Sequence, residues 1–151
     1  MSALAHNPTA TKSERRCLIT GSTGYVGSRI KAKLEAAGWR VTELRRRSPS
    51  SASTIRFQLG EAISPEKLAG HSALVHCAYD FRQISWANIS DVNVRGSELL
   101  LRTAHEAGLR QIVFVSSISA YEGCRSLYGK AKFEIERITR SVGGWNIRPG
   151  L

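Results

Sequence analysis

The sequence predicts an α/β fold in which a doubly wound parallel sheet is covered by helices on both faces. Short apolar segments alternate with amphipathic helical segments along the chain. Some of the apolar segments, such as residues 112–115, are apolar at every position, which is typical of parallel strands buried on both faces. A glycine-rich turn joins the first strand to the first helix. Together these observations predict a Rossmann arrangement with strand order 3-2-1-4-5-6.

The elements follow from the local patterns in chain order. The apolar strand 17–20 leads into the glycine-rich turn, and helix 25–37 follows, with Ile30 and Leu34 on its apolar face and Gly38 as its stop. The other predicted strands are 40–44, 55–59, 73–77, 111–116 and 145–148. The other predicted helices are 65–69, 91–107 and 128–141.

Length and composition are those of one globular domain. The chain has 151 residues, 42% of them hydrophobic and 23% charged. We expect residues 1–14 to form a disordered tail and residues 15–151 to fold. No apolar run approaches the roughly 20 residues of a membrane span, and residues 1–16 lack the apolar core of a secretory signal. Cys17, Cys77 and Cys124 are widely spaced, which fits a reducing, cytoplasmic location.

The net charge of +10 first suggests a nucleic-acid partner. No nucleic-acid recognition motif accompanies the basic residues, so we rank that class last and expect neither a nucleic-acid nor a membrane partner. The histidines are scattered, which predicts no metal site, and His76 at a strand end is interpreted as a structural residue.

Three glycines, Gly21, Gly24 and Gly27, are spaced three residues apart between the first strand and the first helix. The first permits a tight turn, the second lets backbone amides approach a pyrophosphate at the helix N-terminus, and the third lets the helix pack close to the sheet. A flexible turn is the alternative, but the strand–turn–helix context favours nucleotide binding. The other candidate cofactor contacts in the turn are Thr23, Tyr25 and Val26.

The end of the second strand indicates which dinucleotide is bound. NAD sites usually place an acidic residue there, where it accepts hydrogen bonds from the ribose. Here the strand ends in Arg45 and Arg46, and Glu43 lies two residues earlier. Guanidinium groups bind a 2′-phosphate, so the sequence favours NADP, with NAD as the alternative. A solvated basic loop is the other interpretation.

Tyr128 and Lys132 are four residues apart and therefore share one face of a predicted helix. A neighbouring ammonium group and a helix N-terminus both favour the phenolate of a tyrosine, which then exchanges a proton with a substrate carbinol. A serine at the end of the fifth strand is placed to orient the substrate oxygen. Such a pair alone is most often an ordinary surface pair, and it becomes more specific beside the glycine-rich turn.

In these features the chain resembles the N-terminal part of an extended short-chain dehydrogenase/reductase of the NAD(P)-dependent epimerase/dehydratase family. The resemblance runs along nearly all of the chain from residue 15. Besides the glycine turn, Tyr128 and Lys132, the matching segments are 60–61, 75–78, 92–96, 113–117 and 147–150.

The resemblance implies a role for individual residues. Ser117 matches the catalytic serine, Tyr128 the acid/base, and Lys132 the lysine that lowers the tyrosine pKa and holds the nicotinamide ribose. Ala78 matches the backbone that passes the cofactor ribose and phosphates. Glu61 stands where the family usually has an aspartate beside the adenine.

The same resemblance implies hydride transfer between nicotinamide and a carbonyl or carbinol compound, such as a nucleotide sugar. Asn93 matches a helix asparagine that supports the active site. We expect the sheet to stop after its sixth strand and the family's C-terminal substrate-binding region to be absent. An uncovered sheet edge would then favour self-association or a partner chain. The alternatives to an enzyme are a non-catalytic NADP(H)-binding module and an inactive fragment.

Overall fold

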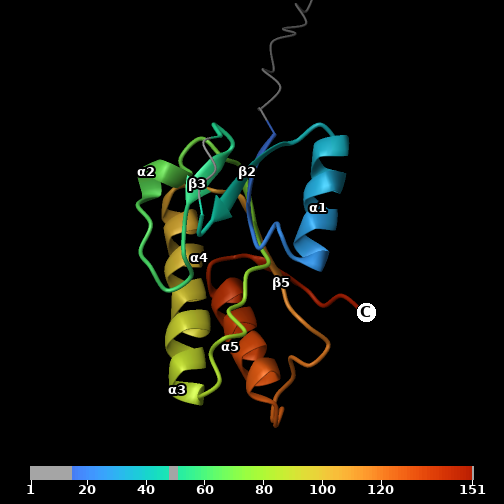
Figure 1. The fold of residues 1–151 in the computed structure, drawn as a ribbon, viewed down its shortest axis with the longest axis vertical. Helices are drawn as coiled ribbons and strands as arrows, with labels where there is room; N and C mark the ends of the chain where they lie inside the picture. Colours follow the sequence, from blue (N-terminus) through green and yellow to red (C-terminus); the bar gives the residue numbers. More distant parts are fainter. Residues whose placement is uncertain (1–14, 48–50, 151) are drawn as a thin grey trace, which may run out of the picture.

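The strands form one sheet whose order follows the prediction. The structure is a computed structural model that describes residues 15–47 and 51–150. It contains a six-stranded sheet of order β3-β2-β1-β4-β5-β6, and every neighbouring pair is parallel (Figure 1). The predicted fold class and strand order are confirmed. The predicted tail, residues 1–14, lies outside the described residues.

The strand bounds agree with the sequence patterns to within one residue except at β3. The strands are β1 Arg16–Thr20, β2 Arg40–Arg45, β3 Thr54–Arg56, β4 Ala73–His76, β5 Gln111–Val115 and β6 Trp145–Ile147. β3 ends three residues before the predicted strand 55–59 does. Phe57 and Leu59 are apolar because they pack into the core from the loop that follows. The apolar residues after Arg56 thus indicate burial of a loop and not a longer strand.

The helices agree with the predictions except in the middle of the chain. They are α1 Tyr25–Ala36, α2 Pro65–Leu68, α3 Trp86–Ile89, the π-helix η1 Ser90–Arg95, α4 Gly96–Glu106 and α5 Leu127–Ser141. The predicted start of helix 91–107 is therefore wrong. The helical path begins at Trp86, because the Ser85 hydroxyl caps it by accepting a hydrogen bond from the Asn88 amide at 3.2 Å.

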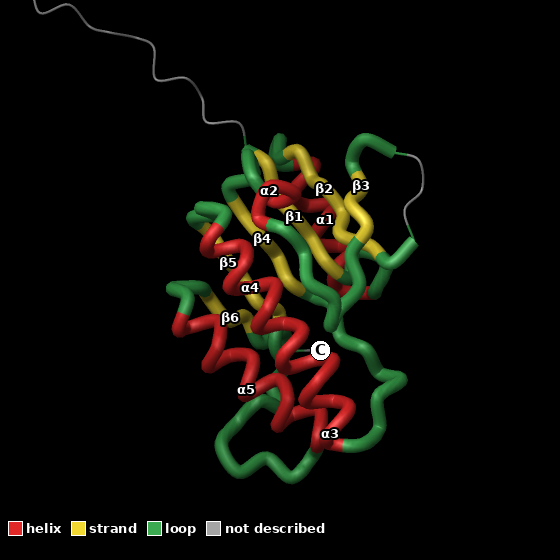
Figure 2. Tube along the Cα trace, turned by 90° about the vertical axis from the view of Figure 1, so that its left-hand side faces the viewer, coloured by secondary structure: helices red, strands yellow, loops and turns green. Residues whose placement is uncertain are grey.

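The sheet separates two apolar cores (Figures 1 and 2). Leu18 of β1 faces the larger core with Leu100 of α4 and Ile135 of α5, while Ile19 faces the smaller core under α1. Successive residues of β1 thus bury against opposite layers, as expected for a central parallel strand.

A buried histidine fixes the carboxyl ends of β1 and β4. The Thr20 hydroxyl accepts hydrogen bonds from the amides of Cys77 (3.0 Å) and Ala78 (3.1 Å), so its own proton goes to Nδ1 of His76, 2.7 Å away. His76 then donates from Nε2 to the Ser97 hydroxyl at 2.8 Å. Burial lowers the pKa of His76 to about 3, so the ring is neutral. The structural interpretation of His76 is confirmed.

Candidate active site

The glycine turn lies at the carboxyl edge of the sheet, against the end of β4. Gly21 has φ +67°, and a Cβ there would lie 2.9 Å from the Ala78 amide nitrogen. A Cβ on Gly27 would overlap the Gly21 carbonyl. Gly24, by contrast, is exposed, and a Cβ there would meet only the Gly21 carbonyl oxygen, at 3.4 Å. Two glycines are therefore required by packing, and the third leaves space in front of the α1 N-terminus.

The N-terminus of α1 beside Gly24 is a favourable place for an anion such as a phosphate. The first amides of a helix are unpaired within the helix and carry partial positive charge, so they favour an anion. Thr23 and Tyr25 are exposed beside Gly24, and the Arg29 guanidinium covers the Tyr25 ring at 3.6 Å from its centroid. Val26 instead packs against the smaller core. The predicted turn residues thus divide into surface positions and a packing position.

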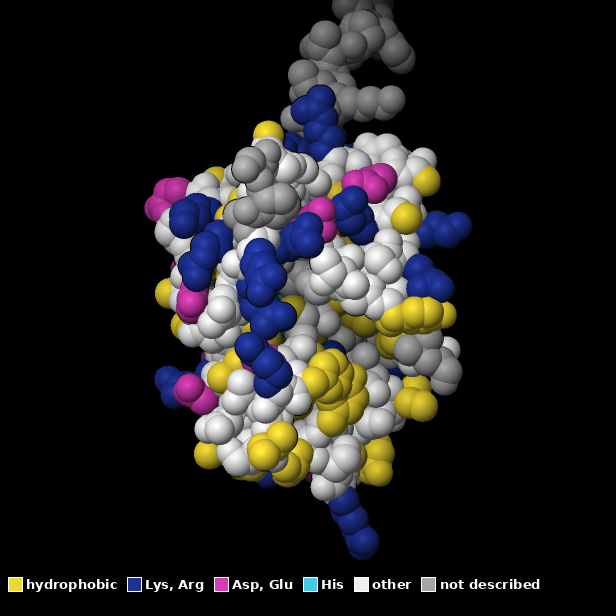
Figure 3. All heavy atoms as spheres, viewed as in Figure 1, with side chains coloured by type: hydrophobic (Ala, Val, Ile, Leu, Met, Phe, Trp, Pro, Cys, Tyr) yellow, Lys and Arg dark blue, Asp and Glu magenta, His cyan; other side chains and the backbone are white. Residues whose placement is uncertain are grey.

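Basic side chains gather where β2 and β3 end, in the upper half of the face shown in Figure 3. Arg45 is the last residue of β2 and is paired in register with Arg56 of β3, and Arg46 is exposed beyond it. The Glu43 carboxylate accepts a hydrogen bond from the Ser22 hydroxyl and lies 3.9 Å from Arg45 Nη1. Glu43 is therefore engaged with Ser22 of the glycine turn and lies near Arg45.

Glu61, the predicted adenine neighbour, lies beside this basic group. Its carboxylate is 3.2 Å from Nη1 of Arg56. It follows Gly60, whose φ of +95° turns the chain after β3. The structure thus places Glu61 at the same end of the sheet as Arg45.

Ser117, Tyr128 and Lys132 come from β5 and α5. The Ser126 hydroxyl caps α5 by accepting from the Gly129 amide at 3.0 Å, which puts Tyr128 in the first helical turn. Ser117 follows the end of β5. Burial raises the pKa of Tyr128, and a hydrogen bond from Ser117 opposes that rise. Ser117 therefore lies near Tyr128, and its hydroxyl also accepts a hydrogen bond from the Ser119 amide at 3.2 Å.

Lys132 departs from its expected arrangement. Its ammonium group donates to the Val115 carbonyl at 2.9 Å and lies 5.6 Å from the centre of the Tyr128 ring. The side chain is 3% exposed, and burial lowers the pKa of the amine to about 8. Burial dominates the shift of the Tyr128 pKa, which is upward in this arrangement. The lowering of that pKa by Lys132 stays a prediction. The ammonium is turned to the strand.

Two aromatic residues that sequence reasoning missed lie against Tyr128. The Tyr79 ring meets it edge to face at 5.0 Å between centroids, and the Phe81 ring stacks on it at 5.7 Å. Tyr79 and Phe81 themselves are 4.8 Å apart. We call these three residues the aromatic cluster. A Tyr-x-Phe pattern directly after a strand, at the edge where parallel sheets bind ligands, was the signal available in the sequence.

Asn93 supports this part of the site, as the resemblance implied. It is fully buried in η1. Its side-chain oxygen accepts from the Asp80 amide at 2.7 Å, and its side-chain nitrogen donates to the Asp80 carbonyl at 3.1 Å. Asn93 therefore holds the backbone between Tyr79 and Phe81.

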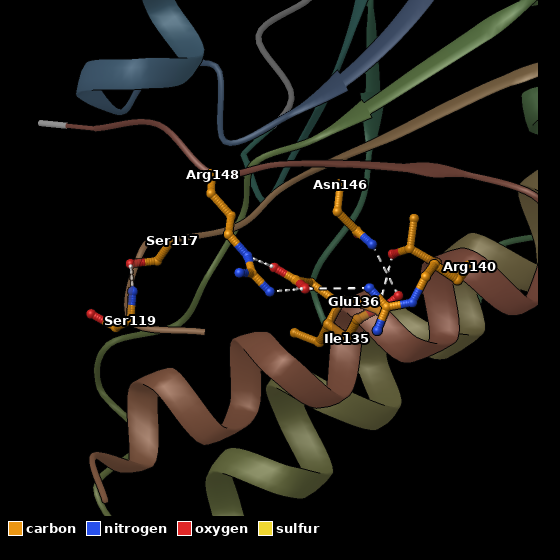
Figure 4. Close-up of polar contacts among 8 residues, drawn as sticks. Ser117, Ser119, Ile135, Glu136, Arg140, Asn146 and Arg148 are labelled. Atoms are coloured by element: carbon orange, nitrogen blue, oxygen red, sulfur yellow. Dashed lines mark hydrogen bonds and ion pairs between the residues drawn. The ribbon is translucent and has the colours of Figure 1, made fainter. Parts of the chain in front are cut away.

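A buried carboxylate ties β6 to α5 behind the site (Figure 4). Glu136 is 1% exposed and accepts from Nε and Nη2 of Arg148, each at 2.7 Å. Asn146 donates to the Glu136 carbonyl at 3.1 Å. Burial raises the pKa of Glu136 and is the largest single influence on it, but the hydrogen bonds and charge of Arg148 together with the other donors around the carboxylate outweigh it, so the pKa is lowered.

Residues 15–47 and 51–150 contain neither a candidate metal-binding group nor a candidate membrane-spanning helix. Over those ranges no group of three or more metal-ligating side chains occurs. None of the helices described there has the length and apolar character needed to cross a membrane.

Comparison with known proteins identifies the family. The sequence profile of the NAD dependent epimerase/dehydratase family matches residues 17–144, which is most of the chain. The chain belongs to this family. Within it, the ceramide reductase of Caulobacter vibrioides is 29% identical over 141 residues, which cover 88% of this chain and 44% of that protein. The decarboxylating sterol-4-alpha-carboxylate 3-dehydrogenase of Bos taurus is 27% identical, covering 72% of this chain and 32% of that protein.

Solved structures of family members share the fold. A short-chain dehydrogenase/reductase superfamily protein from Agrobacterium tumefaciens with bound NAD has a TM-score of 0.75 and 25% identity, covering 89% of this chain and 48% of that one. MoeE5 in complex with UDP-glucose and NAD has a TM-score of 0.74 and 24% identity, covering 88% of this chain and 53% of that one. The chain thus spans about half the length of these proteins and less than half of the curated relatives above.

Proposed function

We propose that the chain is an NADP-dependent oxidoreductase of the epimerase/dehydratase type, with residues 15–151 as its NAD(P)-binding domain and Tyr128 as acid/base. The observation that carries the proposal is that the glycine turn, Ser117 and Tyr128 all lie at the carboxyl edge of the sheet. The glycine turn follows β1, and Ser117 and Tyr128 come together after β5, with β4 between the two strands. Relatives named as a reductase and a dehydrogenase support hydride transfer as the reaction class.

In this proposal the pyrophosphate binds at the α1 N-terminus beside Gly24, and the nicotinamide end reaches the Ala78 backbone and Tyr128. Bound nicotinamide supplies or accepts the hydride. The Tyr128 hydroxyl gives its proton to a substrate carbonyl, or takes one from a carbinol, and Ser117 orients the same oxygen. Lys132 is buried one helical turn from Tyr128 and donates one hydrogen bond to the Val115 carbonyl, which leaves two further donors of its ammonium group for a ribose hydroxyl.

The preference for NADP rests on the end of β2. Arg45 and Arg46 stand where an NAD site has an acidic residue, and Glu43 is engaged with Ser22. The similar solved structures were determined with NAD, so NAD is the alternative to be tested.

Thermal-shift titrations with NADP(H) and NAD(H) test the binding step. At equal cofactor concentrations we expect NADP(H) to stabilise the protein more than NAD(H) does. The stabilisation by NADP(H) is about 2.7 kcal/mol when its concentration is 100 times its Kd. An Arg45→Ala/Arg46→Ala variant should lose about 10- to 100-fold in NADP affinity and little in NAD affinity, because charged hydrogen bonds to the 2′-phosphate are removed. Arg137→Ala, on an exposed face of α5, is the matched control. No stabilisation by either cofactor would refute the proposal.

The Tyr128→Phe variant separates an enzyme from a binding module. In an enzyme, turnover falls by about a hundredfold to ten-thousandfold while NADP affinity is kept. The non-catalytic module remains the second candidate because the buried Lys132 ammonium donates to the Val115 carbonyl in this structure. NADP binding with no ketone reduction sensitive to Tyr128→Phe would support that candidate.

A further inference from the structure

Tyr79 and Phe81 of the aromatic cluster present an apolar surface beside its third member, the proposed acid/base Tyr128. Phe81 is 73% exposed although its ring stacks on Tyr128 with an angle of 21° between the planes. A substrate that reaches the Tyr128 hydroxyl therefore approaches a tyrosine ring flanked by Tyr79 and Phe81. Leaving a phenyl ring in water at this point forgoes the favourable free energy of its burial.

The loop that carries Phe81 is held in place. Besides the bonds from Asn93 to the Asp80 backbone, the Asp80 carboxylate accepts from Nε of Arg82 at 2.8 Å and from Nη2 at 2.6 Å. The Arg82 amide also donates to Asp80 at 3.0 Å. Backbone and side-chain bonds thus converge on the residue between the two aromatic ones, so Phe81 has a fixed position.

More apolar side chains are exposed on the segments that carry the site. The loop after β4 adds one, the loop after β5 two, and the start of α5 one: Ile84, Ile118, Tyr121 and Leu127, which are 83%, 65%, 55% and 39% exposed. Hydrophobic side chains gather in the lower half of the face in Figure 3, away from the basic group. The cofactor end is thus basic and the candidate substrate end apolar.

Two of the three cations of these segments are engaged with neighbouring side chains. Arg82 is bound to the Asp80 carboxylate, and the Lys130 ammonium lies 3.9 Å from the centre of the Trp86 ring. The remaining cation of residues 77–86 and 116–130 is the exposed Arg125. Arg125 is therefore the cation of these segments outside these contacts, so the segments offer a diphosphate little charge, whereas an alkyl or ring system has the exposed apolar side chains to pack on.

From this arrangement we propose that the substrate is a ketone, or the matching secondary alcohol, attached to a large apolar body that packs on Phe81 and Tyr79. This inference rests on the proposed function and names its substrate class. The carbonyl end reaches Tyr128 and Ser117, and the apolar body covers the aromatic cluster. A nucleotide sugar is the class it excludes.

Binding of a homologous ketone series to the full chain tests the proposal. The probes are cyclohexanone and its 4-methyl, 4-propyl and 4-pentyl derivatives, with UDP-glucose as the contrasting ligand, each measured by equilibrium dialysis with and without saturating NADP+. We expect affinity to rise by up to about fourfold per methylene as each is buried. Phe81→Ala should lower the affinity for the pentyl compound about tenfold, and Phe81→Leu should restore part of it.

The control variant is Leu99→Ala on α4, since Leu99 is another exposed apolar residue (46%) but lies outside the site segments. It should leave the series unchanged. The proposal is overturned if affinity is independent of alkyl length, if Phe81→Ala and Leu99→Ala behave alike, or if UDP-glucose binds more tightly than the pentyl compound. Failure of NADP+ to bind in the same experiment would count against the proposed function instead, because the cofactor-free series still reports on the apolar surface.

Discussion

Lys132 holds its amine where water scarcely reaches, between the Val115 carbonyl and the Phe114 ring, whose centre is 4.7 Å away. One hydrogen bond to a neutral carbonyl does not replace the hydration of an ammonium group. Burial therefore favours the neutral amine and lowers its pKa from 10.5 to about 8. A group with that pKa changes its charge just above neutral pH.

This shift predicts a pH-dependent stability. Below pH 8 the amine is protonated in both states, and between pH 8 and 10.5 the unfolded chain binds more protons than the folded one. The free energy of unfolding should therefore gain up to about 3 kcal/mol from this group as pH rises through that range. Urea unfolding of the wild type and of Lys132→Met at pH 7.5 and 10 measures the difference. Parallel pH profiles for the two proteins would contradict a buried, shifted amine.

At the scale of residues, the sequence predicted which side chains form the candidate site better than it predicted where those side chains point. The four-residue spacing put Tyr128 and Lys132 on one helical face, because that depends only on helix geometry. The direction of the Lys132 ammonium depends on the Val115 carbonyl of another element, and the covering of Tyr128 depends on Tyr79 and Phe81, which lie some fifty residues earlier. A local sequence pattern contains neither the direction of the Lys132 ammonium nor the contact of Tyr128 with these two rings.

The turn between β1 and α1 contains glycines with two different tasks. Gly27→Ala should destabilise the fold and abolish cofactor binding, because its Cβ would overlap the Gly21 backbone. Gly24→Ala should leave thermal stability nearly unchanged while weakening NADP affinity at least tenfold, since the new methyl group occupies the space before the α1 N-terminus. Thermal unfolding with and without NADP+ distinguishes the two variants. Equal loss of stability in both would show that Gly24 is a packing glycine.

The buried Glu136–Arg148 pair, which joins α5 to the end of β6, gives a second prediction at the scale of elements. Arg148→Ala leaves the Glu136 carboxylate buried without its bidentate partner, so unfolding should become about 2 to 4 kcal/mol easier. Arg140→Ala should cost far less, because Arg140 is 3.4 Å from the carboxylate and half exposed. Adding Glu136→Gln to Arg148→Ala should recover part of the loss in urea unfolding. No recovery in the double variant would place the effect elsewhere than in the unpaired charge.

Elements were predictable where their signals are local. Apolar runs, glycine stops and spacing located α1 and every strand except β3 to within one residue. The helical path from Trp86 to Glu106 was mispredicted at its start because its cap, Ser85, stands before a segment without clear periodicity. The π segment depends on packing between distant elements, where a Cβ on Gly96 would lie 2.5 Å from the Gly60 amide nitrogen.

Across the whole molecule, the two faces of the sheet are covered unequally. α4 and α5 lie on one face, while α1 lies on the other, over β1 and β2 (Figures 1 and 2). Among the strands of residues 15–47 and 51–150, β6 pairs with β5 alone and is the last strand of the sheet. Asn146 points to α5, so its neighbours Trp145 and Ile147 point to the less covered face. They are 72% and 52% exposed.

An apolar pair on an open edge favours association with a second copy of the chain. We expect sedimentation equilibrium to show self-association that increases with concentration, and Trp145→Ser/Ile147→Ser to shift the protein toward the monomer. Because both side chains are already exposed, the double substitution should change the free energy of unfolding of the monomer by less than about 1 kcal/mol. Ile118→Ser, an equally exposed change in the loop after β5, is the control and should leave the association constant unaltered. A wild-type chain that stays monomeric at every concentration tested would contradict association through Trp145 and Ile147.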